Sequence, residues 1–251
     1  MLPFISIFGR QVAMYGLLNV IGAALGMLAA VYLAGHRTLA RQDVFFASLY
    51  AVIGMLVGGK LLFVITVLPV LWARSAELYL GSELLNAVIY GGFVFYGGLI
   101  GAAVAVRLYC RSYKLSALRM FDALVPGLAL AHAVGRVGCF FAGCCHGIEY
   151  TGPAAVIIGG VSRFPVQLLE SALLLIISGA LLLFLRKERA AGKIAGLYLA
   201  SYSIVRFCLE FVRGDIIRGA FLLLSTSQWL SLALLPAGLY LMFRHKKGAL
   251  L

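Results

Sequence analysis

Arg206, Glu210 and Arg213 stand inside an otherwise apolar segment that covers residues 196–213. Steps of four and three residues place these side chains on one face of an α-helix. Because ionisable groups are costly inside a lipid bilayer, they usually mark a functional site there. The spacing therefore points to a charged site within an apolar helix.

The composition of the chain indicates the medium in which that helix lies. Of 251 residues, 63% are hydrophobic and only 12% are charged, and the mean hydropathy is +1.03. Soluble domains carry about 25% charged residues, whereas several apolar runs here reach the roughly 20 residues needed to cross a bilayer. We therefore predict an all-α, polytopic membrane protein and exclude a soluble fold.

Seven segments have the length and hydropathy of transmembrane helices. They cover residues 12–34, 43–69, 88–109, 119–142, 165–185, 194–213 and 226–243. The second segment is longer than a straight crossing requires, so we expect it to tilt or to kink near Gly58 and Gly59. No cleavable signal peptide is evident, and the first span is expected to remain as an anchor. Residues 1–251 are predicted to form a single transmembrane domain.

The basic residues between the spans predict the orientation of the chain. Twelve fall on one side: Arg37, Arg41, Arg111, Lys114, Arg119, Arg186, Lys187, Arg189, Lys193, Arg244, Lys246 and Lys247. Four fall on the other: Arg10, Arg74, Arg163 and Arg218. Because positively charged loops stay in the cytoplasm, the N-terminus is expected outside and the C-terminus inside. The net charge of +12 then reflects topology and attraction to anionic lipid, with no nucleic acid as partner.

With this orientation, polar residues from six or seven spans fall at one depth, in the outer leaflet. They are Tyr15, Lys60, Tyr96, Arg136, Gln167, Glu170, Arg206, Glu210, Arg213 and Gln228. The pattern favours a positively charged cavity that binds an anionic lipid headgroup through arginine. The structural alternative is a buried Arg206–Glu210 pair that holds helices together, with Arg213 reaching the membrane interface.

Two glycine-rich stretches lie beside these polar residues. Residues 91–101 open the third predicted span, and residues 135–147 close the fourth. Small residues let helices approach closely, which is the favoured interpretation for Gly97 and Gly101. In 135–147 the glycines alternate with Arg136, three cysteines and a histidine. That stretch is expected to bend and to present backbone amides to a ligand.

A series of short motifs follows in order along nearly the whole chain. They are Met14-Tyr15-Gly16, Gly58-Gly59-Lys60, Tyr96-Gly97-Gly98-Leu99-Ile100-Gly101, Asp122 with Pro126, Gly135-Arg136-Val137-Gly138, Arg163-Phe164-Pro165-Val166-Gln167-Leu168-Leu169-Glu170, Arg206-Phe207-Cys208-Leu209-Glu210-Phe211-Val212-Arg213 and Ser227-Gln228. Together with seven spans and an outside N-terminus, the ordered set resembles the prolipoprotein diacylglyceryl transferase family. No single motif decides this, but the set is specific.

The resemblance implies a reaction and its partners. In this family, phosphatidylglycerol gives its diacylglyceryl group to the thiol of a lipobox cysteine, which follows the signal peptide of a prolipoprotein in the lipid bilayer. A thioether forms and glycerol phosphate leaves, at the outer leaflet of the bacterial cytoplasmic membrane. The family needs no metal and no cofactor. An anionic phosphate suits arginines, and a donor with two acyl chains suits a cavity open to lipid.

The resemblance also implies roles for particular residues. Arg136 and Arg206 are expected to hold the phosphate, with Glu210 orienting Arg206 or a substrate hydroxyl, and Tyr15 and Gln167 bonding the headgroup. Further substrate-binding residues are expected at Lys60, Gly97, Gly98, Cys139, Arg163, Glu170 and Arg213, and further catalytic residues at Tyr96 and His132.

The chain departs from the family pattern at positions that the family uses. Its own residues there are Tyr96 for histidine, Cys139 for asparagine, Cys144 for glutamate and Lys60 for arginine. A tyrosine is a poor base near neutral pH, because its ordinary pKa is about 10. His132, one helical turn before Arg136, is an alternative proton acceptor or else a core histidine bonded to backbone.

Three of the five cysteines gather at the expected outer end of the fourth span. Cys139, Cys144 and Cys145 would face an oxidising compartment, so a disulfide or structural thiols are the favoured interpretations. Catalysis and metal binding are the alternatives, and the spacing matches no zinc pattern. Cys110 and Cys208 are expected to pack as inert side chains.

Two other functions stay open on the sequence. A divergent relative on the same scaffold would use another lipid or acceptor, and the changes at Tyr96, Cys139 and Cys144 favour it. A non-enzymatic phospholipid-binding membrane protein would keep the arginines and release no glycerol phosphate. Segments 70–87 and 143–164 are expected outside the membrane, where they would cap the cavity or receive the precursor.

Overall fold

The computed structural model describes residues 3–7, 9–77, 79, 82–187, 190–214, 220–222 and 224–244. Four basic residues of the charge count lie outside these ranges: Arg189, Arg218, Lys246 and Lys247. The described residues are mostly helical. The helices are α1 (Met14–Leu33), α2 (Arg41–Ala73), α3 (Glu83–Tyr90), α4 (Phe95–Ser112), α5 (Ala117–Phe141), α6 (Val166–Leu185), α7 (Lys193–Leu209) and α8 (Thr226–Phe243), with 3-10 turns at Ala34–Arg37, Ser75–Glu77 and Glu210–Val212.

Three antiparallel hairpins accompany the helices in the described part of the chain. They are β1 (Phe4–Ile7) with β2 (Arg10–Ala13), β3 (Val156–Ile158) with β4 (Val161–Arg163), and β5 (Ala220–Phe221) with β6 (Leu224–Ser225). Their registers pair Phe4 with Ala13, Val156 with Arg163, and Ala220 with Ser225. The all-α prediction did not include them, because strands of two to four residues are too short to show an alternating pattern.

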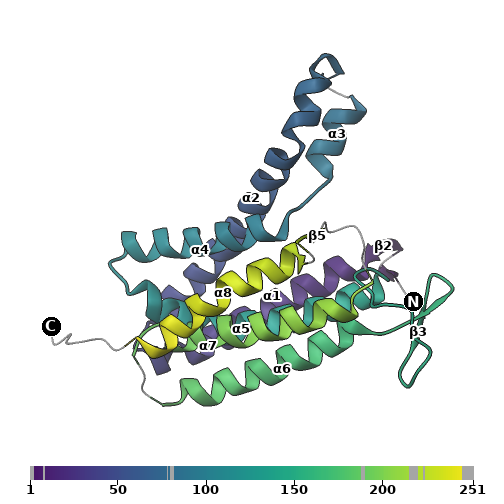
Figure 1. Cartoon of the computed structure of the whole chain (residues 1–251). Helices are drawn as coiled ribbons and strands as arrows, with labels where there is room; N and C mark the ends of the chain where they lie inside the picture. The colour runs from purple at the N-terminus through teal and green to yellow at the C-terminus, as the bar shows by residue number, and fades with distance from the viewer. Residues whose placement is uncertain are drawn as a thin grey trace. The chain divides into compact units, whose positions relative to one another are not determined.

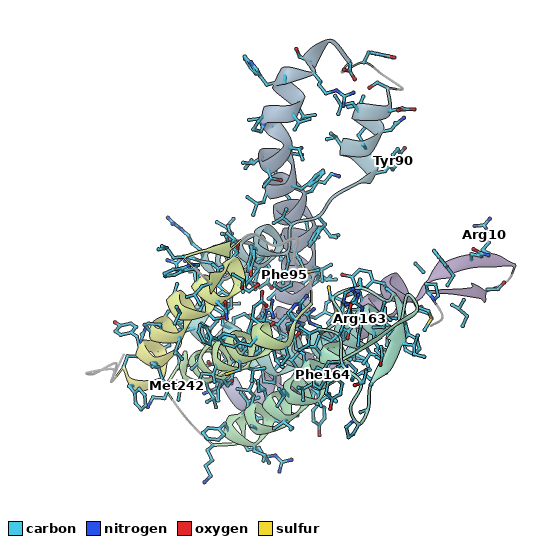
Figure 2. All side chains as sticks on the ribbon, turned by 45° about the vertical axis from the view of Figure 1, so that its right-hand side comes forward. Arg10, Tyr90, Phe95, Arg163, Phe164 and Met242 are labelled. Carbon is cyan, nitrogen blue, oxygen red and sulfur yellow. The ribbon has the colours of Figure 1, made fainter. Side chains whose placement is uncertain are left out.

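The helices confirm a polytopic membrane protein. Among the described residues, the helices long and apolar enough to cross a membrane are Met14–Arg37, Arg41–Ala73, Ala117–Phe141, Val166–Leu185 and Lys193–Val212. Helices α3 and α4 meet the same criterion as a pair bent by 52°, and Figure 2 shows the connecting segment between Tyr90 and Phe95. This bent pair stands where the sequence predicts one span at 88–109. Helix α8 begins and ends where the last predicted span does.

The chain forms two compact units, residues 1–41 with 121–251 and residues 42–120. In the first unit, α1, α5, α6, α7 and α8 run side by side (Figure 1). Close contacts between backbones join them in antiparallel pairs. A side chain at Gly26 would collide with the Gly127 carbonyl of α5, and one at Gly196 would collide with the Gly238 carbonyl of α8. The glycines therefore let neighbouring helices approach as small residues do in membranes.

A buried carboxylate joins three helix ends in this unit. Asp122, near the start of α5, lies 3.3 Å from the Arg37 guanidinium that follows α1. The same carboxylate accepts hydrogen bonds of 2.8 Å from the backbone amides of Gly192 and Ala195, at the start of α7. Asp122 has no exposed surface. It thus caps α7 and neutralises Arg37 at once.

Replacing Asp122 with alanine is expected to destabilise the protein by about 3 kcal/mol, because it leaves a buried arginine and two helix-end amides without their carboxylate. Thermal unfolding in detergent measures this loss. Ser178→Ala is the matched control, since it removes one neutral hydrogen bond to the Pro126 carbonyl and should cost about 1 kcal/mol. Equal loss in the two variants would contradict the role assigned to Asp122.

The second unit contains α2, α3 and α4. Helix α2 continues without a break through Gly58 and Gly59, near which the sequence predicts a tilt or a kink. These glycines make room for α4 and for the residues that directly precede it. A side chain at Gly58 would collide with the Gly97 carbonyl, and one at Gly59 would collide with the Phe93 ring. Gly54 and Gly101 form the next contact of the same kind.

Candidate functional site

Glu170, in the first turns of α6, is the centre of a buried charged group in the first unit. Its Oε1 lies 3.0 Å from Nη2 of Arg136 on α5 and accepts a 2.9 Å hydrogen bond from the Tyr202 hydroxyl on α7. Its Oε2 lies 4.0 Å from Nη1 of Arg213. The Glu170 side chain has no exposed surface. One carboxylate thus links three segments that are distant in sequence.

A second carboxylate continues the group. Oε2 of Glu210 lies 2.6 Å from Nη2 of Arg206 and 3.8 Å from Nε of Arg213. The Arg206 guanidinium also donates a 2.9 Å hydrogen bond to the Ser227 hydroxyl at the start of α8. The charges therefore alternate from Arg136 to Arg206, with each glutamate between two arginines.

This group carries one more positive than negative charge when all its members are ionised. Its side chains are between 0% and 14% exposed, so the surplus charge is poorly solvated. Among the described residues, Nε of Arg136 and Nη1 of Arg206 make no hydrogen bond, nor does Oε1 of Gln167. A surplus of buried positive charge with unused N–H donors is suited to an anion such as phosphate.

The sequence explains part of this arrangement locally. Arg206 and Glu210 are four residues apart and pair at the end of α7, as the spacing predicts. Helix α7 ends at Leu209, and Arg213 follows the turn Glu210–Val212 in extended backbone. Arg213 thus does not lie on the helix itself, but it still approaches Glu210.

The loop after α5 contacts two other segments, the one that precedes α6 and the one that follows α7. The backbone of Gly147 pairs with that of Arg213 and its amide donates to the Phe164 carbonyl at 3.1 Å. A side chain at Gly147 would collide with the Phe164 and Val212 carbonyls. The Cys144 carbonyl accepts a 2.7 Å hydrogen bond from Nε2 of Gln167, which is 1% exposed. The predicted bend in 135–147 is confirmed, and it holds the ends of α5, α6 and α7 together.

Arg163 lies next to this loop. Its Nη1 donates to the Gly147 carbonyl at 3.5 Å, and Figure 2 shows it beside Phe164, at the end of β4. Arg163 and His146 line a pocket of about 530 Å³, together with Pro3, Gly143 and Gly160. Arg163 thus contacts the loop after α5 at Gly147, whose backbone also pairs with that of Arg213.

His132 on α5 contacts a residue of the charged group's surroundings, and Tyr15 on α1 lies near the end of the same helix α5. The His132 ring packs edge-on against Tyr202, with ring centres 5.0 Å apart, next to the hydroxyl that bonds Glu170. Tyr15, at the start of α1, is 48% exposed. Its backbone packs against Gly138, the residue before the buried Cys139. These residues thus belong to the same end of the first unit as Arg136.

The remaining predicted site residues lie in the second unit and make their contacts there. The Lys60 ammonium donates to the carbonyls of Val88, Ile89 and Gly91, at 2.5, 2.9 and 2.6 Å. Gly97 packs against Gly58, Gly98 against Met55, and the ring of Tyr96 against Phe95. Lys60 therefore caps the C-terminal end of α3, where a cation also complements the helix dipole.

Replacing Lys60 with methionine is expected to loosen α3, because three carbonyls lose a charged donor worth about 1.5 kcal/mol or more. Hydrogen exchange of the α3 amides should accelerate roughly tenfold. Lys60→Arg, which keeps a charged donor, is the control and should exchange close to the rate of the unchanged protein. Unchanged exchange in the methionine variant would show that Lys60 does not hold α3.

Sequence reasoning missed two polar residues of this site, Tyr202 and Asn19, and gave Ser227 no role of its own. Tyr202 bonds Glu170, Ser227 bonds Arg206, and the Asn19 side chain bonds the Tyr15 carbonyl at 2.7 Å beside Gly135. Helical spacing offered a signal, since Tyr202 precedes Arg206 by four residues and Asn19 follows Tyr15 by four. Ser227 stands in the Ser227-Gln228 motif, but its bond to Arg206 was not predictable, because it depends on how α7 packs against α8.

The fold and this site define a polytopic membrane protein with a buried, arginine-rich charged group. The model of the family "Prolipoprotein diacylglyceryl transferase" matches residues 3–244. A phosphatidylglycerol–prolipoprotein diacylglyceryl transferase of Clostridium tetani is 34% identical over 246 residues, covering 94% of each chain. One from Clostridium perfringens is 34% identical over 94% of this chain and 92% of its own. One from Finegoldia magna is 32% identical over 96% and 94%.

The chain therefore belongs to the prolipoprotein diacylglyceryl transferase family. The resemblance drawn from the ordered motifs is confirmed, and with it the assignment to a family of bacterial membrane transferases of lipoprotein biosynthesis.

Proposed function

We propose that this protein transfers the diacylglyceryl group of phosphatidylglycerol to the lipobox cysteine of prolipoproteins. The observation that carries the proposal is the buried group around Glu170 and Glu210, in which arginines outnumber carboxylates. An anionic phosphate supplies the charge that this group lacks. The names of the relatives give phosphatidylglycerol as the donor and a prolipoprotein as the acceptor.

In this proposal Arg136 and Arg206 bind the phosphate. Each is held by one carboxylate, Glu170 or Glu210, and each retains an N–H without a hydrogen bond among the described residues. Glutamate contacts fix the guanidinium planes before the lipid binds, so less ordering is needed at that moment. Arg213 adds charge between the two carboxylates. Gln167 and Tyr15 bond the headgroup, and Cys139, Arg163, Lys60, Gly97 and Gly98 stay proposed substrate contacts.

The chemistry requires a thiolate and a stable leaving group. The lipobox sulfur attacks the glyceryl carbon that carries the phosphate ester, so a carbon–sulfur bond forms while the carbon–oxygen bond breaks. Glycerol phosphate leaves with the bonding electrons, and Arg136 and Arg206 stabilise its growing charge. The thiol proton passes to a base. We propose His132 or Tyr96 for that role, and Tyr202 beside His132 connects the first of these to Glu170.

We further propose a seven-span topology with the N-terminus outside and the charged group in the outer leaflet of the bacterial cytoplasmic membrane. Asp122 joins the end of α1 to the starts of α5 and α7, whereas the group around Glu170 lies at the other ends of α5 and α7. This arrangement supports alternating directions for these helices. Helix α8 and, within the bent pair, helix α4 supply the remaining spans. Segments 70–87 and 143–164 then lie outside a single membrane domain.

Incubation with a synthetic lipobox peptide and phosphatidylglycerol vesicles tests the reaction. Mass spectrometry should show a peptide heavier by one diacylglyceryl group, and glycerol phosphate should appear in equal amount. A peptide with serine in place of the lipobox cysteine should stay unmodified. Vesicles of phosphatidylethanolamine serve as the donor control.

Other results would favour the two alternatives. Transfer from another lipid or to another acceptor would identify a divergent relative on the same scaffold. Saturable phosphatidylglycerol binding with no glycerol phosphate released would identify a non-enzymatic lipid binder.

A further inference from the structure

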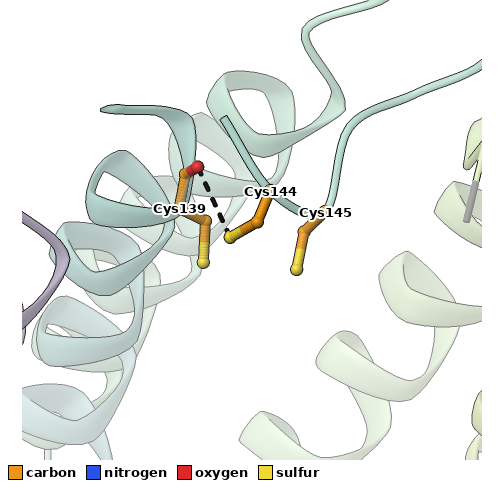
Figure 3. Close-up of side chains that lie close together, drawn as sticks. All are labelled: Cys139, Cys144 and Cys145. Atoms are coloured by element: carbon orange, nitrogen blue, oxygen red, sulfur yellow. Dashed lines mark hydrogen bonds between the residues drawn. The ribbon is translucent and has the colours of Figure 1, made fainter. Parts of the chain in front are cut away.

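Cys139, Cys144 and Cys145 bring three sulfur atoms together at the turn after α5. The three Sγ atoms all lie within 4.8 Å of one another, and Figure 3 shows the side chains next to each other on this turn. Cys139 is buried at the end of α5, Cys145 is half-buried and Cys144 is exposed. The cluster therefore has one member fixed by a helix and two that are open to approach from outside.

The backbone holds the two turn cysteines in place. Gly143 and Cys145 both adopt left-handed backbone, with φ of +70° and +57°, a conformation that residues with a side chain rarely adopt. Between them, the Cys144 carbonyl is bonded to Gln167. The Cys144 thiol donates to the Cys139 carbonyl at 3.7 Å. These contacts direct the sulfurs of a strained turn toward the helix end.

The distances suit one metal ion. A metal–sulfur bond measures about 2.3 Å, so sulfurs that share an ion lie roughly 3.8–4.0 Å apart in tetrahedral or trigonal geometry. Sulfurs within 4.8 Å of one another reach that spacing by small side-chain rotations. A disulfide would use two thiols and leave the third beside it, whereas one ion takes all three.

Two arginines lie close to the cluster. Arg136 stands one helical turn before Cys139 on α5, and the backbone of Arg213 pairs with that of Gly147, two residues after Cys145. Three thiolates around one monovalent or divalent ion form an anionic complex. Positive neighbours stabilise such a complex, whereas they would repel a metal held by neutral ligands.

We propose that Cys139, Cys144 and Cys145 form a three-thiolate site for a soft, thiophilic metal ion of the zinc or copper(I) class. Thiolate ligands select these ions over magnesium or calcium. The three thiols release their protons on binding, and the metal forms one bond to each sulfur. Zinc keeps a fourth position open, whereas copper(I) is satisfied by three sulfurs. The site adjoins the arginine group, since the Cys144 carbonyl is bonded to Gln167, and metal binding is measured without the transfer reaction.

Metal titration of the full-length protein in detergent tests the proposal. The protein is first reduced and freed of metal under argon, then titrated with Zn²⁺ or Cu⁺ against a coloured competing chelator, and with Cd²⁺ as an ultraviolet probe of thiolate bonds. We expect one ion per chain and a cadmium–thiolate charge-transfer band. The Cys139→Ser, Cys144→Ser, Cys145→Ser triple variant should lose both the ion and the band.

Two single variants keep the test independent of folding. Cys144→Ser changes an exposed turn residue and should weaken binding, whereas Cys208→Ser removes an exposed thiol outside the cluster and should bind like the unchanged protein. Binding that survives in the triple variant, or that is lost with Cys208, overturns the proposal. So does a reduced protein that binds no ion. Zinc and copper(I) are distinguished by which ion the chelator fails to remove.

Discussion

Replacing Arg206 or Arg136 with alanine is expected to lower the rate of diacylglyceryl transfer by a factor of about 10² to 10³. Removing one preorganised donor that stabilises a developing anion typically has an effect of this size. Arg206 is held by Glu210 and Ser227, and Arg136 is held by Glu170. Neither arginine can therefore move to replace the other. Transfer to a labelled lipobox peptide in phosphatidylglycerol vesicles measures the loss.

Lysine variants at these positions test the planar geometry separately from the charge. Arg206→Lys keeps a positive charge but loses the fork that bonds two oxygens at once, so we expect activity between those of arginine and alanine. Arg74→Ala is the matched control, because Arg74 is an exposed arginine paired only locally with Glu77. Full transfer by both Arg136→Ala and Arg206→Ala would remove the proposed phosphate site.

The sequence could predict the elements and the local charge pairs of this protein. Apolar runs define helices wherever lipid surrounds them, and four-residue spacing pairs Arg206 with Glu210 on one helix. The break between α3 and α4 was not predicted, because residues 88–106 contain no charged side chain and the turn depends on Gly92, whose φ is +62°. Apolarity alone does not distinguish a straight span from a bent one.

Contacts between helices were less accessible from the sequence. The bond of Glu170 to Tyr202 depends on the rotation of α6 against α7. The bond of Arg206 to Ser227 depends on the packing of α7 against α8, whose backbones approach closely at Gly196 and Gly238. The cysteine cluster is a similar case. Its spacing matches no zinc pattern, but the left-handed Cys145 brings the three sulfurs together. Tertiary packing thus decides which predicted polar residues meet.

Replacing Glu170 is expected to lower both the stability of the protein and the rate of transfer. Glu170→Ala is expected to destabilise the protein by about 3–5 kcal/mol, because it leaves buried arginines with one carboxylate instead of two. Tyr202 would lose its acceptor as well. Thermal unfolding in detergent measures the change, and transfer should fall at least as far as in Arg136→Ala, since Glu170 contacts Arg136 directly.

A double variant shows whether unbalanced charge causes the loss of stability in the Glu170 variants. Glu170→Gln alone keeps the shape but adds one uncompensated positive charge, whereas Glu170→Gln with Arg136→Gln removes one charge of each sign. Groups in contact are not additive, so the double variant should be more stable than the sum of the single losses predicts. Transfer should stay lost, because the phosphate has lost Arg136. If the two losses simply add, Glu170 does not stabilise the protein by neutralising Arg136. Restored transfer in the double variant would mean that Arg136 holds no phosphate.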